Sequence, residues 1–125
     1  MNSNHLFTFE KLSIWQDARS WVKSIYQITS LFPSIEKFGM KDQLNRAAVS
    51  VPTNVAEGSA RTSKKDQAHF TQLAYSSLIE VLNLLILASD QGYLSESDLS
   101  FQRNQIQMMT MKLNALYHSQ RRRSK

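Results

Sequence analysis

The chain has 125 residues, 42% of them hydrophobic and 20% charged, so we expect one globular domain with a substantial core. Its 3 glycines and 2 prolines argue against an all-β or loop-rich protein, because such folds use turn residues often. The absence of cysteine excludes disulfides, thiolate catalysis and Cys-ligated zinc, while the net charge of +5 allows a polyanionic partner.

The spacing of apolar residues predicts a first helix over about residues 10–31. Its packing seam recurs at the steps of three and four residues that define one helix face: Leu12, Trp15, Ala18, Val22, Ile25 and Thr29. Pro33 ends this helix, because a residue before proline avoids helical backbone angles. We expect Trp15 in the core and Trp21, on a different side, toward a subunit interface.

A second helix is predicted over about residues 40–57, with Pro52 inside it. Proline lacks the N–H that would bond the carbonyl of Ala48, and its ring crowds that carbonyl, at a cost of about 3 kcal/mol. We expect a kink at Pro52 rather than a stop, since two shorter helices would pack poorly. Gly58 is expected to cap this helix in a left-handed conformation.

A third helix is predicted over about residues 64–90, beginning after Ser63 and capped by Gly92. Its seam holds nine positions: Phe70, Leu73, Ala74, Ser77, Leu78, Val81, Leu82, Leu85 and Ala88. Three more apolar residues lie off this seam: Tyr75, Ile79 and Ile86. A helix with more than one apolar side in so small a bundle favours contact with a second subunit.

A fourth helix is predicted over about residues 96–117, after Ser95, with its apolar residues at Leu99, Ile106, Met108, Met109, Met111, Leu113 and Leu116. The short connections make consecutive helices antiparallel neighbours. We therefore predict a single domain over residues 1–125. It is an all-α, antiparallel up-down four-helix bundle with a proline-kinked second helix and a basic tail at 119–125, and it forms a homo-oligomer.

Positive charge is concentrated near the C-terminus. Residues 99–125 carry six basic and no acidic side chains, whereas residues 1–98 carry 9 basic and 10 acidic ones. The candidate nucleic-acid contacts are therefore Arg103, Lys112, Arg121, Arg122, Arg123 and Lys125. The alternative is a solvated terminus that aids solubility.

A polar stripe runs along the second helix, at spacings that place its members on one face: Arg46, Ser50, Asn54, Glu57 and Arg61. One interpretation is a ligand or nucleic-acid surface, with the arginines donating to phosphates. The favoured interpretation is structural, either a subunit interface or a network within the bundle. In that network Glu57 pairs with an arginine and Asn54 bonds a backbone group freed by Pro52.

Catalytic chemistry has little support in the sequence. The three histidines, His5, His69 and His118, are scattered, so we predict no metal site and no cofactor. Glu57 and Glu80 are the acids expected to be buried, but nothing places them together. The first nine residues lack the pattern of a signal peptide and the longest apolar run is short, so we expect a cytoplasmic protein without a membrane partner.

Several ordered motifs resemble the ribosomal-RNA intervening-sequence protein family, also called the four-helix bundle protein family. They include LSIWQDA at residues 12–18, FP at 32–33, EKFG at 36–39 and QL at 43–44. The signature block RAAVSVPTNVAEG at 46–58, followed by Arg61, is the longest, and GYL at 92–94 follows later. Asn45-Arg46 and Tyr75-Ser76 depart from the family's usual Arg-Arg and Arg-Gly, and both changes remove positive charge.

The resemblance implies an antiparallel four-helix bundle that assembles into a ring, typically a homopentamer, without an established activity. A more distant similarity is to the accessory proteins of diversity-generating retroelements, basic pentameric rings that associate with a reverse transcriptase and nucleic acid. We expect a non-enzymatic protein associated with RNA or DNA, with a nucleic-acid enzyme as a further partner. The alternative is a protein-interaction scaffold with no nucleic-acid role.

Overall fold

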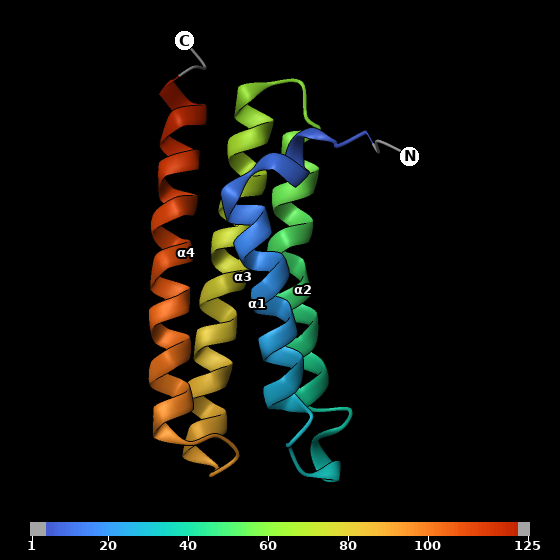
Figure 1. Cartoon of the computed structure of the whole chain (residues 1–125), viewed down its shortest axis with the longest axis vertical. Coiled ribbons are helices and arrows are strands. Elements are labelled where there is room, and N and C mark those ends of the chain that lie inside the picture. The colour runs from blue at the N-terminus through green and yellow to red at the C-terminus, as the bar shows by residue number, and fades with distance from the viewer. Residues whose placement is uncertain (1–4, 123–125) are drawn as a thin grey trace.

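The computed structural model describes residues 5–122, which form four α-helices and two short 3-10 helices and contain no strand (Figure 1). The helices are α1 (Ser13–Thr29), α2 (Met40–Ser59), α3 (Lys64–Asp90) and α4 (Glu96–Arg122). The 3-10 helices η1 (Thr8–Lys11) and η2 (Ser34–Glu36) precede α1 and α2. The prediction of an all-α four-helix bundle is confirmed.

Consecutive helices run antiparallel, so each end of the bundle gathers fixed parts of the chain (Figure 1). One end holds η1, the α2–α3 connection and the end of α4, at the top of Figure 1. The other holds the α1–α2 and α3–α4 connections. Helix α3 packs extensively against both α2 and α4, whereas α1 contacts α2 far more than α4.

The core face of α1 is rotated from the predicted seam, and Trp21, not Trp15, lies fully in the core. Trp21 is 3% exposed, and its indole Nε1–H donates to Gln102 Oε1 at 2.8 Å. Trp15 is half-buried, with its ring 4.9 Å from that of Phe9. The residues buried in α1 are Ile14, Ala18, Trp21, Ile25 and Thr29. The spacing is compatible with two adjacent apolar stripes, and the hydrogen bond to Gln102 on α4 favours the stripe that contains Trp21.

Helix α2 continues through Pro52 as one helix to Ser59, so proline does not stop it. The expected kink remains a prediction. Gly58 is not the cap that the sequence suggested, since among residues 5–122 only Gly92 has a positive φ. Gly58 is buried inside the last turn, where a Cβ would lie 2.9 Å from Cβ of Phe70 on α3. A glycine is therefore required at position 58, because α2 packs closely on α3 there.

The predicted caps of α3 and the start of α4 are confirmed. Ser63 Oγ accepts the backbone N–H of Asp66 at 3.0 Å, and Ser95 Oγ accepts that of Asp98 at 3.1 Å. Gly92 has φ 81°. Tyr93 N–H bonds the Ala88 carbonyl at 3.0 Å and Gly92 N–H bonds that of Ser89 at 2.9 Å, which together form a Schellman motif.

Most of the predicted apolar positions of α3 and α4 line a shared core, but several are open to solvent. The most buried members are Ala74, Leu78, Val81, Leu85, Ala88, Ile106, Met109 and Leu113. Leu73, predicted in the seam, is exposed, and so is Ile79, which was predicted to lie off the seam. By length and composition alone α3 could cross a membrane, a test that core helices of soluble proteins also pass. Its contacts with α2 and α4 bury part of its apolar surface.

Candidate nucleic-acid interface

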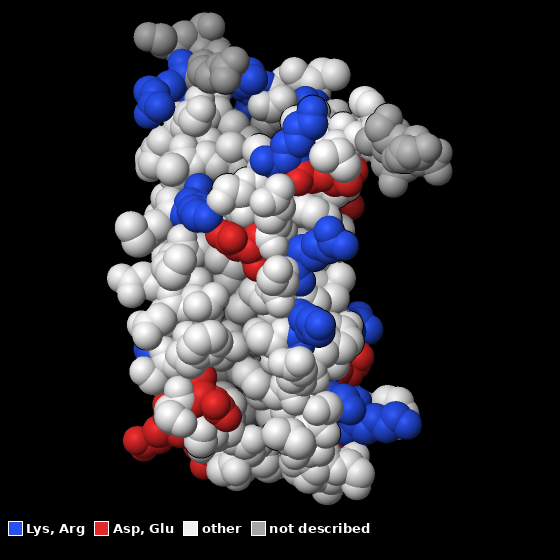
Figure 2. Space-filling view, viewed as in Figure 1, with Lys and Arg blue, Asp and Glu red and all other residues white. Residues whose placement is uncertain are grey.

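Five cationic side chains lie around the α2–α3 connection and the end of α4. We call this set the basic end; its members are Arg61, Lys64, Lys65, Arg121 and Arg122. Lys11 of η1 and the acidic residues Glu10, Glu57 and Asp66 lie at the same end of the bundle. Figure 2 shows Lys and Arg gathered there. The opposite end holds the acidic residues Asp90, Glu96 and Asp98 beside the α3–α4 connection and Lys37 and Lys41 beside the α1–α2 connection.

The register of α4 against α3 brings the two parts of the basic end together. Thr71 Oγ1 and Gln120 Oε1 lie 2.7 Å apart, with the Thr71 hydroxyl donating across the two helices. Arg121 and Arg122 follow Gln120 directly, while Lys64 and Lys65 lie about two turns before Thr71. Both pairs therefore extend beyond this hydrogen bond toward the same end (Figure 1).

Arg61 in the α2–α3 connection is held in place by its neighbours. Its guanidinium carbon lies 4.5 Å from the ring centroid of Phe70 on α3. Its carbonyl accepts a hydrogen bond from Gln67 Nε2 at 2.8 Å. The side chain stays exposed despite these contacts, so its guanidinium can still donate to a ligand.

The dipoles of α3 and α4 act differently on the lysine pair, Lys64 and Lys65, and on the arginine pair, Arg121 and Arg122. Arg121 and Arg122 stand in the last turn of α4, where the dipole favours positive charge. Lys64 and Lys65 stand in the first turn of α3, where it opposes positive charge, and Asp66 offsets only part of this. The lysines thus add positive potential to the positive pole of α3, which favours an anionic ligand at the basic end.

Lys64 and Lys65 were missed by the sequence analysis, which placed the excess charge in residues 99–125. Summing the charges along the chain does not reveal them, because residues 1–98 are nearly neutral. The predicted up-down topology could have located them. In an up-down bundle the start of the third helix and the end of the fourth meet at one end, so Lys64-Lys65 and Arg121-Arg122 could have been paired.

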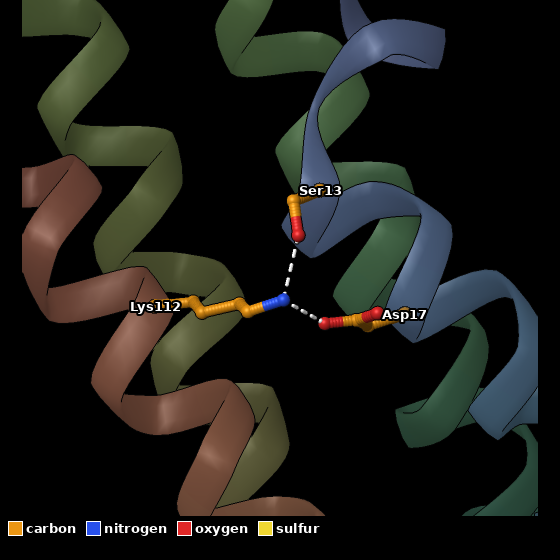
Figure 3. A network of polar contacts seen from close by, with 3 residues as sticks. All are labelled: Ser13, Asp17 and Lys112. Atoms are coloured by element: carbon orange, nitrogen blue, oxygen red, sulfur yellow. Dashed lines mark hydrogen bonds and ion pairs between the residues drawn. The ribbon is translucent and has the colours of Figure 1, made fainter.

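Lys112, one of the predicted contacts, is partly exposed but already engaged with side chains of α1. Figure 3 shows its side chain reaching from α4 to α1, where Nζ donates to Ser13 Oγ at 2.6 Å and pairs with the Asp17 carboxylate. Arg103 is exposed but lies early in α4, far from the basic end. Arg123 and Lys125 lie outside the described residues. Arg121 and Arg122 are therefore the predicted contacts that the structure brings into the basic end.

The polar stripe of α2 does not form the network that we expected. Arg46 pairs with Asp42 on its own helix at 3.8 Å, and no ion pair among residues 5–122 involves Glu57, which is exposed. Asn54 Nδ2 donates to the Ser50 carbonyl at 2.8 Å, not to the Ala48 carbonyl that Pro52 leaves without its helical donor. Ser50 Oγ bonds the Ala47 carbonyl at 2.7 Å. These bonds are all local to α2.

The two acids expected to be buried, Glu57 and Glu80, are both exposed, so that expectation was wrong. Solvent reaches them because each follows a core residue by two positions and so points away from the core face. Within the described part of the chain, no group of three His, Asp or Glu side chains is placed to hold a metal ion.

The sequence was compared with known protein families and with curated proteins. The family model described as 23S rRNA-intervening sequence protein matches residues 10–115, which span all of α1, α2 and α3 and most of α4. The comparison with curated proteins found no match.

Proposed function

The chain belongs to the 23S rRNA-intervening sequence protein family, and from this premise we propose that it is a non-enzymatic, cytoplasmic protein that associates with nucleic acid through its basic end. The observation that carries the proposal is the convergence of Arg61, Lys64, Lys65, Arg121 and Arg122 at one end of the bundle. Phosphate groups are the polyanionic ligand that such a cluster binds best, because arginine and lysine both donate charge-assisted hydrogen bonds to phosphate oxygens.

The size of the cluster sets the expected strength of the salt effect. If all five side chains contact phosphates of a single strand, the logarithm of the affinity should fall with the logarithm of salt at a slope of about −3.5. Such binding by one chain is weak at physiological salt, so the proposal includes assembly, which would present several basic ends to one ligand and raise the affinity through effective concentration.

We propose that this assembly is a homo-oligomeric ring, most simply a pentamer. The supporting observation is the number of large apolar side chains that one chain leaves in solvent on more than one helix: Val49, Ile79, Leu87, Phe101, Met108 and Met111. Contiguous exposed apolar surface commonly marks a protein interface. Light scattering should give about five times the chain mass of 14.4 kDa, and a monomer at micromolar concentration would refute assembly.

The nucleic-acid proposal is tested with fluorescently labelled single strands of RNA and DNA, titrated at several salt concentrations. The variant is Arg121→Gln/Arg122→Gln, which keeps the helix length and the Thr71–Gln120 bond. It should bind more weakly and with a slope reduced in magnitude by about 1.4, the share of two phosphate contacts.

The matched control removes two positive charges elsewhere. Arg103→Gln/Lys37→Gln changes one exposed residue early in α4 and one near the opposite end of the bundle, and should bind almost as the parent does. Equal losses in both double variants would mean that net charge alone attracts the ligand. No loss in Arg121→Gln/Arg122→Gln would show that the basic end is not the contact surface.

The second candidate function is a protein-interaction scaffold, and the open side between α1 and α4 favours it. Ile28 and Leu31 of the α1 end face Phe101 across this groove, with Met108 farther along α4. An intact oligomer that binds neither RNA nor DNA at low salt would favour the scaffold over the nucleic-acid proposal.

A further inference from the structure

A cleft lies between α3 and α4 immediately beside the basic end. Its volume is about 390 Å³, within the range of sites that hold small molecules or parts of larger ligands. Its polar and aromatic walls come from both helices: His69, Gln72, Ser76, Asn114, Tyr117 and His118. The sequence analysis treated the histidines as scattered, because it did not place His69 opposite His118.

The cleft offers hydrogen-bonding groups that the protein itself leaves open. Within residues 5–122, the side chains of Gln72, Ser76 and Asn114 form no hydrogen bond. Two amides and a hydroxyl can both donate and accept, which matches the mixed donor and acceptor edges of nucleobases. A pure phosphate site would instead need converging cations, and among the described residues no lysine or arginine lines the cleft.

One side chain links the cleft to the basic end. Arg121 Nη1 donates to Tyr117 Oη at 3.3 Å, and its guanidinium carbon lies 5.8 Å from the centroid of that ring. Tyr117 lines the cleft, so an arginine of the basic end stands at the edge of the cleft. A phosphate on Arg121 would bring its own base to the ring of Tyr117, on which a base can stack.

We propose that the α3–α4 cleft receives an unpaired base of a single-stranded nucleic acid whose phosphates contact the basic end. This inference rests on the proposed function and names its ligand class. A duplex does not fit the site, because its bases are stacked and their edges are paired, whereas an unpaired base can turn out of the strand.

The test compares two labelled ligands with the same number of phosphates, a short mixed-sequence single strand and an abasic strand. The parent protein should bind the base-bearing strand about tenfold more tightly at the same salt concentration. Asn114→Leu removes an exposed amide of the cleft and should reduce this preference by about fivefold, the share of one hydrogen bond, without changing affinity for the abasic strand. The matched control is Asn104→Leu, an exposed position of α4 outside the cleft, which should keep the full preference.

The outcomes separate this inference from the proposed function. Equal affinity of the parent for both strands overturns the base site but leaves phosphate binding at the basic end. Salt-independent or absent binding of both strands overturns the proposed function as well. A second measurement does not depend on variants: a strand carrying iodouridine is crosslinked by light and the adducts are mapped by mass spectrometry. Adducts at Tyr117, His118 or His69 support the cleft, and adducts confined to other peptides refute it.

Discussion

The buried contact between α1 and α4 supports a prediction about Gln102. This side chain is 1% exposed, accepts the indole N–H of Trp21 at 2.8 Å and donates to Ser24 Oγ at 3.1 Å. Gln102→Leu keeps roughly the same volume but leaves the Trp21 N–H buried without a partner. We expect the variant to fold and to be less stable than the parent.

The magnitude follows from the unpaired donor. A buried polar group that loses its partner costs about 1–3 kcal/mol, and we take about 2 kcal/mol because leucine recovers some apolar contact. For a chain of this length each kcal/mol moves the melting temperature by about 4 °C, so Tm should fall by about 8 °C. Trp21→Phe/Gln102→Leu should lose less than the sum of the two single losses, because neither polar group then remains.

The assay is thermal and urea unfolding followed by circular dichroism at one fixed protein concentration, since assembly would make stability depend on concentration. Gln107→Leu, the same change on the exposed face of α4, serves as the control and should stay within about 0.5 kcal/mol of the parent. A stability of Gln102→Leu equal to that of the control, or simple addition of the losses at Trp21 and Gln102, would contradict a buried Trp21–Gln102 hydrogen bond.

Two further predictions concern the ends of the bundle. Gly58→Ala should lower the free energy of unfolding by about 1 kcal/mol in urea titrations, because crowding against Cβ of Phe70 outweighs the higher helix propensity of alanine; an unchanged or higher stability would contradict it. The hydrogen bond from Tyr93 Oη to the carboxylate of Glu36, then burial and the carboxylate charge, raise the pKa of Tyr93. Because the folded-state pKa is raised, the stabilising contribution of Tyr93 is fully present below its unfolded pKa of about 10 and is lost as the pH rises through the folded-state pKa. Tyr93→Phe should therefore have a lower Tm than the parent at pH 8 and approach the parent above pH 10. A constant difference in Tm across that range would be inconsistent with this contribution.

The helices could be predicted well because their signals are local. Ser63 and Ser95 bond N–H groups only three residues away, and the Schellman motif at Gly92 closes within six residues. The role of Gly58 could not be predicted from its neighbours along the chain. Its neighbour in space, Phe70, belongs to another helix, so a glycine needed for packing looked like a glycine needed for a cap.

The candidate site was predictable only in part for the same reason. Arg121 and Arg122 stand out along the chain, but Lys112 belongs to the same run and is engaged with Ser13 and Asp17 nearly a hundred residues away. Composition counts charges and cannot tell which of them are already paired. The same limit hid Lys64 and Lys65, because a sum over residues 1–98 is nearly neutral and does not show where in the fold each charge lies.

The positive charge lies at one end of the bundle and not along one face. The symmetry of an assembly therefore decides whether one nucleic-acid strand can reach several basic ends. In a cyclic ring whose axis runs along the helices, every copy points in the same direction, so all the basic ends would lie on one face of the ring. A dihedral assembly would divide them between two opposite faces. One strand could then reach several basic ends only in the cyclic case, and only if it is long enough to span neighbouring copies. The affinity should therefore rise steeply with strand length for a cyclic ring, and the α3–α4 clefts beside the basic ends would each face the same strand.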